Sequence, residues 1–245
     1  MLISVVVITY NEAAKIERCL RSVLPIADEL IVVDSLSTDD TREIAAHLGA
    51  TIVQQPFLGY KEQKNFATLQ ARHNWVLNLD ADETLDEALL ASIQKFKAQT
   101  PDFVAYKLPR TTQFCGQWIK HGGWFPDHQT RLYNKTKGEW QGLKIHEKWQ
   151  PFNKTTLGKL NGSIMHYSFD SLTDYHLQQQ KFALLAAESN KLKGYRPGWS
   201  KIWVSPIFKF ILNYLFRLGF LDGLKGLQVC FWTAYYTHLK YKLSR

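Results

Sequence analysis

Along the first hundred residues, short continuous apolar runs alternate with stretches in which apolar residues recur every three or four positions. The continuous runs lie at residues 2–8, 29–33, 51–53 and 75–79. Runs of this length are typical of strands that are buried on both faces. Strands that alternate with helices predict an α/β fold with a mostly parallel sheet and helices on both of its faces.

The stretches between and after these runs predict four helices. The first helix has one apolar face, made of Ile16, Cys19, Leu20 and Val23. The second helix is predicted to be capped by Ser37 or Thr38, to turn Ile44, Ala45 and Leu48 inward, and to end at Gly49. The third spans residues 61–72. The fourth follows a capping box, Thr84-Leu85-Asp86-Glu87, and runs through Phe96.

Beyond Pro101 the pattern changes. Residues 103–108 predict another strand, and a region dense in Trp, Gly and His follows without helical periodicity, which indicates loops and short strands. Aromatic rings with a few converging polar groups suit a carbohydrate pocket, whereas core packing is the alternative role for any single Trp.

Two amphipathic helices are predicted near the C-terminus. The first is expected to start at Ser205-Pro206 and to end at Gly219, with Lys209, Asn213 and Arg217 on its polar side. The second follows Asp222 and ends in Lys240, Lys242 and Arg245. No uncharged apolar run reaches the length that spans a bilayer, so the helices are expected to lie in a membrane interface. The alternative is that they pack on the catalytic domain or on a partner chain.

The charge distribution supports a special role for this end of the chain. The 245 residues are 45% hydrophobic, which excludes disorder, and carry a net charge of +8. Residues 1–150 have a balance of −1, and residues 151–245 have a balance of +9. A basic segment of this kind suits nucleic acid, anionic lipid or a phosphorylated acceptor. Its apolar content favours an anionic membrane surface, and no nucleic-acid motif is present.

The cysteines and the N-terminus indicate the compartment. The three cysteines are far apart and form neither a metal-ligand spacing nor a disulfide framework, which favours the reducing cytoplasm. The apolar residues 2–8 have no basic lead and no cleavage site, so they are predicted to be a first strand and not a signal peptide.

The fourth apolar run ends in three acids, Asp80, Asp82 and Glu83. Ligands of open α/β sheets bind outside the carboxyl ends of the strands, so these carboxylates are expected where a bound phosphate needs a divalent cation. Carboxylate oxygens suit Mg²⁺ or Mn²⁺. The alternative is that the acids only charge the first turn of the following helix.

Three linked motifs resemble family 2 glycosyltransferases of the GT-A fold. They are Ile8-Thr9-Tyr10-Asn11-Glu12, Val33-Asp34-Ser35 with Ser37-Thr38-Asp39, and Asp80-Ala81-Asp82. The resemblance implies that the nucleotide site is lined by Thr9, Asn11, Glu12 and Asp34. It also implies that Asp80 contacts the ribose or the metal, that Asp82 binds the metal, and that Lys64 lies near the donor phosphates. Asp34 is suited to accept the imide N–H of uracil.

Each of these residues also has a purely structural alternative. Asn11 is a possible cap of the first helix, and Asp34 a possible turn residue. Lys64 fits equally well on a solvated helix face.

From Gly122 onward the chain is similar to a subgroup of this family that adds glucose to the inner core of bacterial lipopolysaccharide. The matching elements are His121-Gly122-Gly123-Trp124, Pro126-Asp127, Arg131-Leu132, His146-Glu147, His166-Tyr167-Ser168 and Gly219-Phe220-Leu221-Asp222-Gly223. Inverting transfer needs one carboxylate base and no covalent nucleophile. Glu147 is the first candidate and Asp127 the second. The resemblance makes His166 a candidate third metal ligand with Asp80 and Asp82, and a core histidine is the alternative.

The combined prediction is a GT-A catalytic domain over residues 1–200 and an amphipathic helical extension over residues 201–245. Residues 1–100 are its nucleotide-sugar half and residues 101–200 its acceptor half. The resemblance implies an inverting enzyme that moves glucose from UDP-glucose to a lipid-linked oligosaccharide, at a heptose of the lipopolysaccharide inner core. Its expected location is the cytoplasmic face of the inner membrane. The rival functions are a nucleotidyltransferase, which ordinarily has a Gly-rich phosphate loop after the first strand, and a non-catalytic carbohydrate-binding protein.

Overall fold

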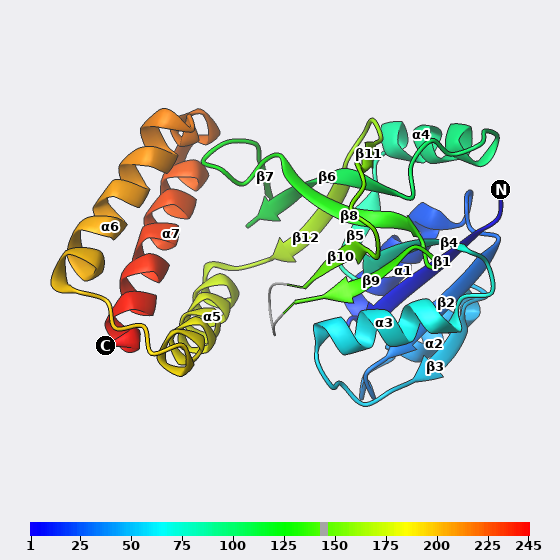
Figure 1. Cartoon of the computed structure of the whole chain (residues 1–245), viewed down its shortest axis with the longest axis horizontal. Coiled ribbons are helices and arrows are strands. Elements are labelled where there is room, and N and C mark those ends of the chain that lie inside the picture. The colour runs from blue at the N-terminus through cyan, green and yellow to red at the C-terminus, as the bar shows by residue number, and fades with distance from the viewer. Residues whose placement is uncertain (143–146) are drawn as a thin grey trace. The chain divides into compact units, whose positions relative to one another are not determined.

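A computed structural model describes residues 1–142 and 147–245 of the chain. The chain forms two compact units, the first from residues 1–110 and 127–166 and the second from residues 111–126 and 167–245. Figure 1 shows the course of the chain. Two strands, β6 (Ala105–Phe114) and β12 (Ile164–Phe169), contribute residues to both units.

The first unit is built on a sheet whose parallel part has the order β3-β2-β1-β4. These strands are β1 (Ile3–Thr9), β2 (Glu29–Asp34), β3 (Thr51–Gln54) and β4 (Trp75–Asp80). Antiparallel pairing of β4 with β8 (Asp127–Asn134), and of β8 with β6, extends the sheet. The remaining described strands are β5 (Glu83–Leu85), β7 (Gln117–Ile119), β9 (Gly138–Gln141), β10 (Lys148–Pro151) and β11 (Gly158–Lys159).

Helices cover both faces of the parallel strands, as predicted. Val5 and Val7 of β1 lie in one core cluster with the apolar face of α1 (Ala13–Val23), whereas Val6 and Ile8 lie in another with Ala67 of α3 (Tyr60–Gln70). The other helices of this unit are α2 (Thr41–His47) and α4 (Glu87–Lys97). The predicted buried face of α1, made of Ile16, Cys19, Leu20 and Val23, is confirmed.

The predicted caps of α2 and α4 are wrong. Asp40 precedes α2 without a side-chain cap, because Ser37 bonds to Asp34 instead. The N-cap of α4 is Asp86, whose Oδ1 accepts the N–H of Leu89 at 2.7 Å. Thr84 does not cap this helix, because it lies on β5 and pairs with β12.

Strand register places three predicted site residues along one edge of the sheet. Thr9 is the register partner of Asp34 across β1 and β2, and Ile8 is the partner of Asp80 across β1 and β4. The chain order reverses between β1 and β4, and ligands of open α/β sheets bind at such a switch point. The carboxyl ends of β1, β2 and β4 therefore define the candidate site.

The second unit contains three long helices, α5 (Leu172–Leu192), α6 (Trp199–Ile211) and α7 (Gly223–Ser244). Helices α6 and α7 run side by side, and α5 also packs on α7 (Figure 1). A turn of π-helix (Leu212–Phe216) and a 3-10 turn (Gly219–Asp222) connect α6 to α7. No single described helix is long and apolar enough to cross a membrane. The helical segments Trp199–Phe216 and Gly219–Ser244, which are bent by 73° relative to each other, are together long and apolar enough for a broken span.

The predicted start of a helix at Ser205-Pro206 is wrong, because α6 begins at Trp199 and includes Pro206. Gly219 likewise begins the 3-10 turn and does not end a helix. A proline inside a helix leaves the carbonyl four residues earlier without its donor. Here that carbonyl belongs to Ile202, and Nδ1 of His238 on α7 lies 3.0 Å from it. Because a carbonyl only accepts, Nδ1 carries the proton, and this bond ties α6 to α7.

We expect His238→Ala to lower the free energy of unfolding by about 1–3 kcal/mol, because it leaves the Ile202 carbonyl without a donor. In a Pro206→Ala background the N–H of Ala at position 206 bonds to the Ile202 carbonyl. There the loss of unfolding free energy on His238→Ala should be smaller by at least about 1 kcal/mol. Urea denaturation of the four proteins measures this coupling. The ring of His238 also lies 4.8 Å from that of Trp203, centroid to centroid. Equal losses in both backgrounds would show that His238 acts only through this ring contact.

Candidate active site

The loops after β1 and β2 are held together by side chains from both. Oδ1 of Asn11 accepts the N–H of Thr38 at 2.8 Å, and the N–H of Asn11 donates to Oγ of Ser37 at 2.8 Å. Asn11 has a φ of 52°, which asparagine tolerates better than most residues. Asn11 therefore does not cap α1, whose N-cap is Glu12.

Asp34 is fully buried at the end of β2. Its Oδ1 accepts the N–H of Ser37 at 2.9 Å, and its Oδ2 accepts the hydroxyl of the same residue. These bonds show that Asp34 stabilises the turn after β2, which was the structural alternative for this residue. Its contact with uracil stays a prediction. In the same region the N–H of Glu12 donates to Oγ1 of Thr41 at 2.8 Å.

Thr9, at the end of β1, presents a polar atom that the protein leaves unsatisfied. Its side chain is 5% exposed, and its Oγ1 has no hydrogen-bond partner among the residues that the structure describes. Buried polar atoms are usually bonded, so an orphaned hydroxyl at the edge that carries Asp34 and Asp80 favours a ligand there.

Two of the acids that end and follow β4, Asp80 and Glu83, are paired with arginines, of which Arg131 is buried and Arg110 is partly exposed. Nη2 of Arg131, on β8, lies 2.5 Å from Oδ2 of Asp80 and 2.7 Å from Oε1 of Glu83. Nη1 of Arg110 lies 3.1 Å from the same Glu83 oxygen. Burial by itself would raise the pKa of Asp80, but the charges of Arg131 and Lys64 outweigh it and hold the pKa far below its usual range. Asp80 is therefore ionised.

Lys64 connects this cluster to the candidate base. Its Nζ lies 2.8 Å from Oε1 of Glu147, 3.5 Å from Oδ1 of Asp80 and 4.8 Å from the centroid of the Trp140 ring. Lys64 is only 4% exposed, so the alternative of a solvated helix face is wrong. The side chain of the neighbouring Asn65 bonds both the N–H and the carbonyl of Trp140 at 2.9 Å, which fixes that residue beside the lysine.

Asp82 and His166, two of the candidate metal ligands, lie in direct contact, and their binding of a metal stays a prediction. Oδ2 of Asp82 lies 3.2 Å from Nε2 of His166 on β12. Burial would raise the pKa of Asp82, but the charge and the hydrogen bond of His166 lower it below the usual value. Within the described parts of the chain, no group of three or more His, Cys, Asp or Glu side chains is placed to hold a metal. A carboxylate and an imidazole nevertheless fit a cation that takes its other ligands from a diphosphate.

Asp127, the second candidate base, is already engaged. Nε and Nη2 of Arg110 donate to its Oδ2 at 3.0 and 2.7 Å, and Nε2 of Gln129 donates to its Oδ1 at 2.8 Å. It lines a pocket of about 530 Å³ with Trp140 and Trp149, which is of a size and composition that suit a sugar. The choice between Glu147 and Asp127 stays a prediction, and the motif residue His146 lies outside the described residues.

The pairing of Arg131 and Arg110 with Asp80 and Glu83 was not predicted from the sequence. The pattern offered one indication. Three carboxylates within four positions after a buried strand need counter-charges, and Arg131 is one of the basic residues in the region predicted to form loops and short strands. Only the antiparallel pairing of β4, β8 and β6 shows which arginines supply them.

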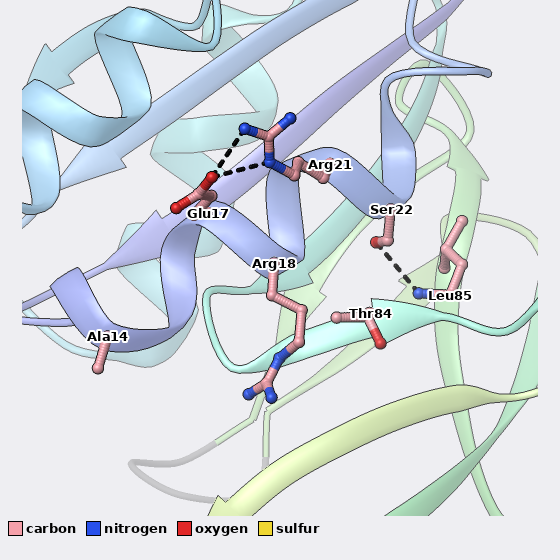
Figure 2. A pocket seen from close by; sticks show the side chains of 7 residues that line it. All are labelled: Ala14, Glu17, Arg18, Arg21, Ser22, Thr84 and Leu85. Carbon is pink, nitrogen blue, oxygen red and sulfur yellow. Dashed lines mark hydrogen bonds and ion pairs between the residues drawn. The ribbon is translucent and has the colours of Figure 1, made fainter.

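A further hollow of about 570 Å³ in the first unit is lined by α1 and β5 (Figure 2). Glu17 and Arg21 are paired across one turn of α1 at 2.8 Å, and Oγ of Ser22 accepts the N–H of Leu85 at 3.2 Å. None of the predicted site residues lines this hollow, so it is distinct from the candidate site.

Comparison with known proteins decides the family. Residues 4–153, more than half of the chain, match the family model described as glycosyl transferase family 2. The chain belongs to this family. An uncharacterized glycosyltransferase of Rickettsia prowazekii is 36% identical over 91% of this chain and 80% of its own length. The lipopolysaccharide core biosynthesis glycosyltransferase LpsC of Rhizobium meliloti is 28% identical over 95% of this chain and 90% of its own.

Solved structures confirm the fold. The mannosyltransferase PcManGT of Pyrobaculum calidifontis, solved with GDP-Man and Mn²⁺, has a TM-score of 0.57 and 15% identity, and the match covers 99% of this chain and 86% of that one. The predicted GT-A fold, family and enzyme class are therefore confirmed. The family match favours a glycosyltransferase over both rival functions.

Arg131→Met should lower the free energy of unfolding by about 3–5 kcal/mol, because it leaves Asp80 and Glu83 without their shared buried cation. Arg21→Met is the control, since it breaks an exposed pair worth about 0.3–0.5 kcal/mol. Urea denaturation compares the two variants. Similar losses would contradict a structural role for the buried network.

Proposed function

We propose that the protein is an inverting hexosyltransferase that moves glucose from UDP-glucose to a lipid-linked acceptor, a heptose of the lipopolysaccharide inner core. The proposal includes action at the cytoplasmic face of the inner membrane. The observation that carries it is Lys64, a buried cation within 3.5 Å of both Asp80 and Glu147. The name of LpsC supports a core saccharide as the acceptor.

The donor occupies the carboxyl edge of β1, β2 and β4. Thr9, Asn11, Glu12 and Asp34 form its nucleotide end, with Asp80 beside the ribose. Lys64 faces the diphosphate, to which an ammonium group is suited as a point charge. Asp82 and His166, with Asp80, hold Mg²⁺ or Mn²⁺. A divalent cation in that position neutralises negative charge on the departing diphosphate.

Glu147 takes the proton of the acceptor hydroxyl while the leaving diphosphate departs from the opposite face of the sugar. This reaction needs no covalent intermediate, so one carboxylate is sufficient. In the absence of donor, Glu147 is paired with Lys64 at 2.8 Å. Diphosphate oxygens compete for that ammonium group, which loosens its bond to Glu147, so the donor binds before the base acts.

Glu147→Gln should reduce the rate of transfer by roughly 10²–10⁴-fold, because the amide keeps the shape of the side chain and accepts no proton. Donor binding, measured by calorimetry, should persist. Glu139→Gln, on the exposed side of β9, is the control and should leave the rate unchanged. If Asp127→Asn shows this pattern and Glu147→Gln does not, the base is Asp127.

Nucleotide release from UDP-, GDP- and dTDP-glucose, with and without Mn²⁺, tests the donor and the metal together. We expect release to be fastest with UDP-glucose and to stop when a chelator is added. Asp82→Asn should also abolish turnover without unfolding the protein, since an amide is a poorer metal ligand than a carboxylate. Full activity in chelator-treated enzyme would exclude a metal-assisted reaction.

A further inference from the structure

The second unit contains a pocket of about 440 Å³ with a basic side and an apolar side. Its basic residues are Lys120, His121 and Arg217, and its apolar residues include Phe125, Phe216 and Leu218. No Asp or Glu is among the described residues that line it. A concave site lined by one sign of charge attracts ligands of the opposite sign, so the pocket is suited to an anion.

Asp222, which is not among the lining residues, fixes the loop that carries two of these basic residues. Its Oδ2 accepts the N–H groups of Lys120 and His121 at 3.0 and 2.8 Å, and its Oδ1 lies 2.9 Å from Nδ1 of His121. Asp222 is only 7% exposed, and both of its carboxylate oxygens contact the loop of Lys120 and His121. With Nδ1 engaged, Nε2 is the nitrogen of His121 that remains for a ligand.

A glycine lets Arg217 lie against the same loop. Gly123 has a φ of +81°, and a Cβ atom added there would come within 2.4 Å of Nη1 of Arg217. The N–H of Gly122 also donates to the carbonyl of Arg217 at 2.9 Å. These contacts hold Arg217 against the loop that carries Lys120 and His121, and all three residues line the pocket. The charges of Lys120 and Arg217 attract an anion into it.

Large apolar side chains are exposed next to this basic pocket. Phe216, which lines it, is 76% exposed, and Leu224, at the start of α7, is 78% exposed. Leu215, just before Phe216, and Leu218, Phe220 and Leu221, between Phe216 and Leu224, are also exposed. Contiguous exposed apolar residues mark an interaction surface. A small soluble anion would leave this apolar rim in water, whereas a phospholipid supplies a phosphate for the pocket and a hydrocarbon boundary for the rim.

We propose that the pocket of Lys120, His121 and Arg217 binds the phosphate of an anionic phospholipid within a bilayer, with the rim from Leu215 to Leu224 inserted at the acyl boundary. This site goes beyond the proposed transfer reaction. Its test uses neither donor nor acceptor, so either proposal can fail without the other.

Sedimentation of the full chain with phosphatidylglycerol–phosphatidylcholine vesicles, and with phosphatidylcholine vesicles alone, measures this binding. The double variant Lys120→Gln with Arg217→Gln should bind the anionic vesicles roughly tenfold or more weakly, since each basic residue at such a surface contributes about one kcal/mol. The control, Lys191→Gln with Lys193→Gln, removes the same charge from exposed positions on and just after α5, and should bind within about twofold of the wild type. Circular dichroism and thermal melting establish that both variants are folded.

The rim is tested separately. Phe216→Ser should weaken binding to both kinds of vesicle, whereas Leu192→Ser, which changes an equally exposed residue on α5, should not. Equal effects of the two double variants would overturn the pocket as a specific site. Displacement by millimolar inorganic phosphate, together with no effect of Phe216→Ser, would identify a site for a soluble phosphate and contradict the lipid. A wild-type dimer that Phe216→Ser makes monomeric without changing vesicle binding would show that the rim is a subunit interface, which also overturns the proposal.

Discussion

The first unit depends on the neutralisation of the acids that follow β4. Glu83 is fully buried and Arg131 is 2% exposed, and removing such ions from water costs several kcal/mol for each of them. Their attraction offsets that cost only when the geometry is good and the remaining polar atoms are bonded. Arg131 contacts Asp80 and Glu83 with one nitrogen and donates from Nη1 to Asn78 at 3.3 Å, but its buried Nε has no hydrogen-bond partner among the described residues, so the cost is only partly offset. A packed apolar cluster would stabilise the fold at lower cost, so the charges are best explained by what they position at the edge of the sheet.

Helices and strands could be predicted from the sequence where the local pattern of apolar residues defines a buried face. The strands of the parallel sheet and the buried face of α1 could be predicted because their periodicity depends on nearby residues. The errors occur where a competing contact decides. Ser37 bonds to Asp34, three positions earlier, and not to the start of α2, whereas Thr84 enters a strand because the distant β12 pairs with it. Pro206 lies inside α6, where His238 bonds to the carbonyl that the proline leaves free.

The candidate site was predictable in part, for the same reason. Parallel strands end at a common edge, so Thr9, Asp34 and Asp80 could be placed together from the order of apolar runs alone. Arg131 and Arg110 could not, because they reach the acids from antiparallel strands more than 25 positions away in sequence. The burial of Lys64 could not be predicted from the pattern either, although the family resemblance named the residue. The buried face of α3 includes the polar residues Gln63 and Thr68, so its pattern resembles that of a solvated helix.

Lys64 also shows how the two halves of the proposed reaction are connected. A buried ammonium group needs negative partners, and in this structure it has Asp80 on the donor side and Glu147 on the side of the base. Asp80 has a second cationic partner, Arg131, so it stays paired when Lys64 is drawn away. Glu147 has no second ion-pair partner among the described residues, so its availability changes when an anion draws Lys64 away. Under the proposed reaction that anion is the donor diphosphate, and the base becomes free to accept a proton only when there is a sugar to transfer.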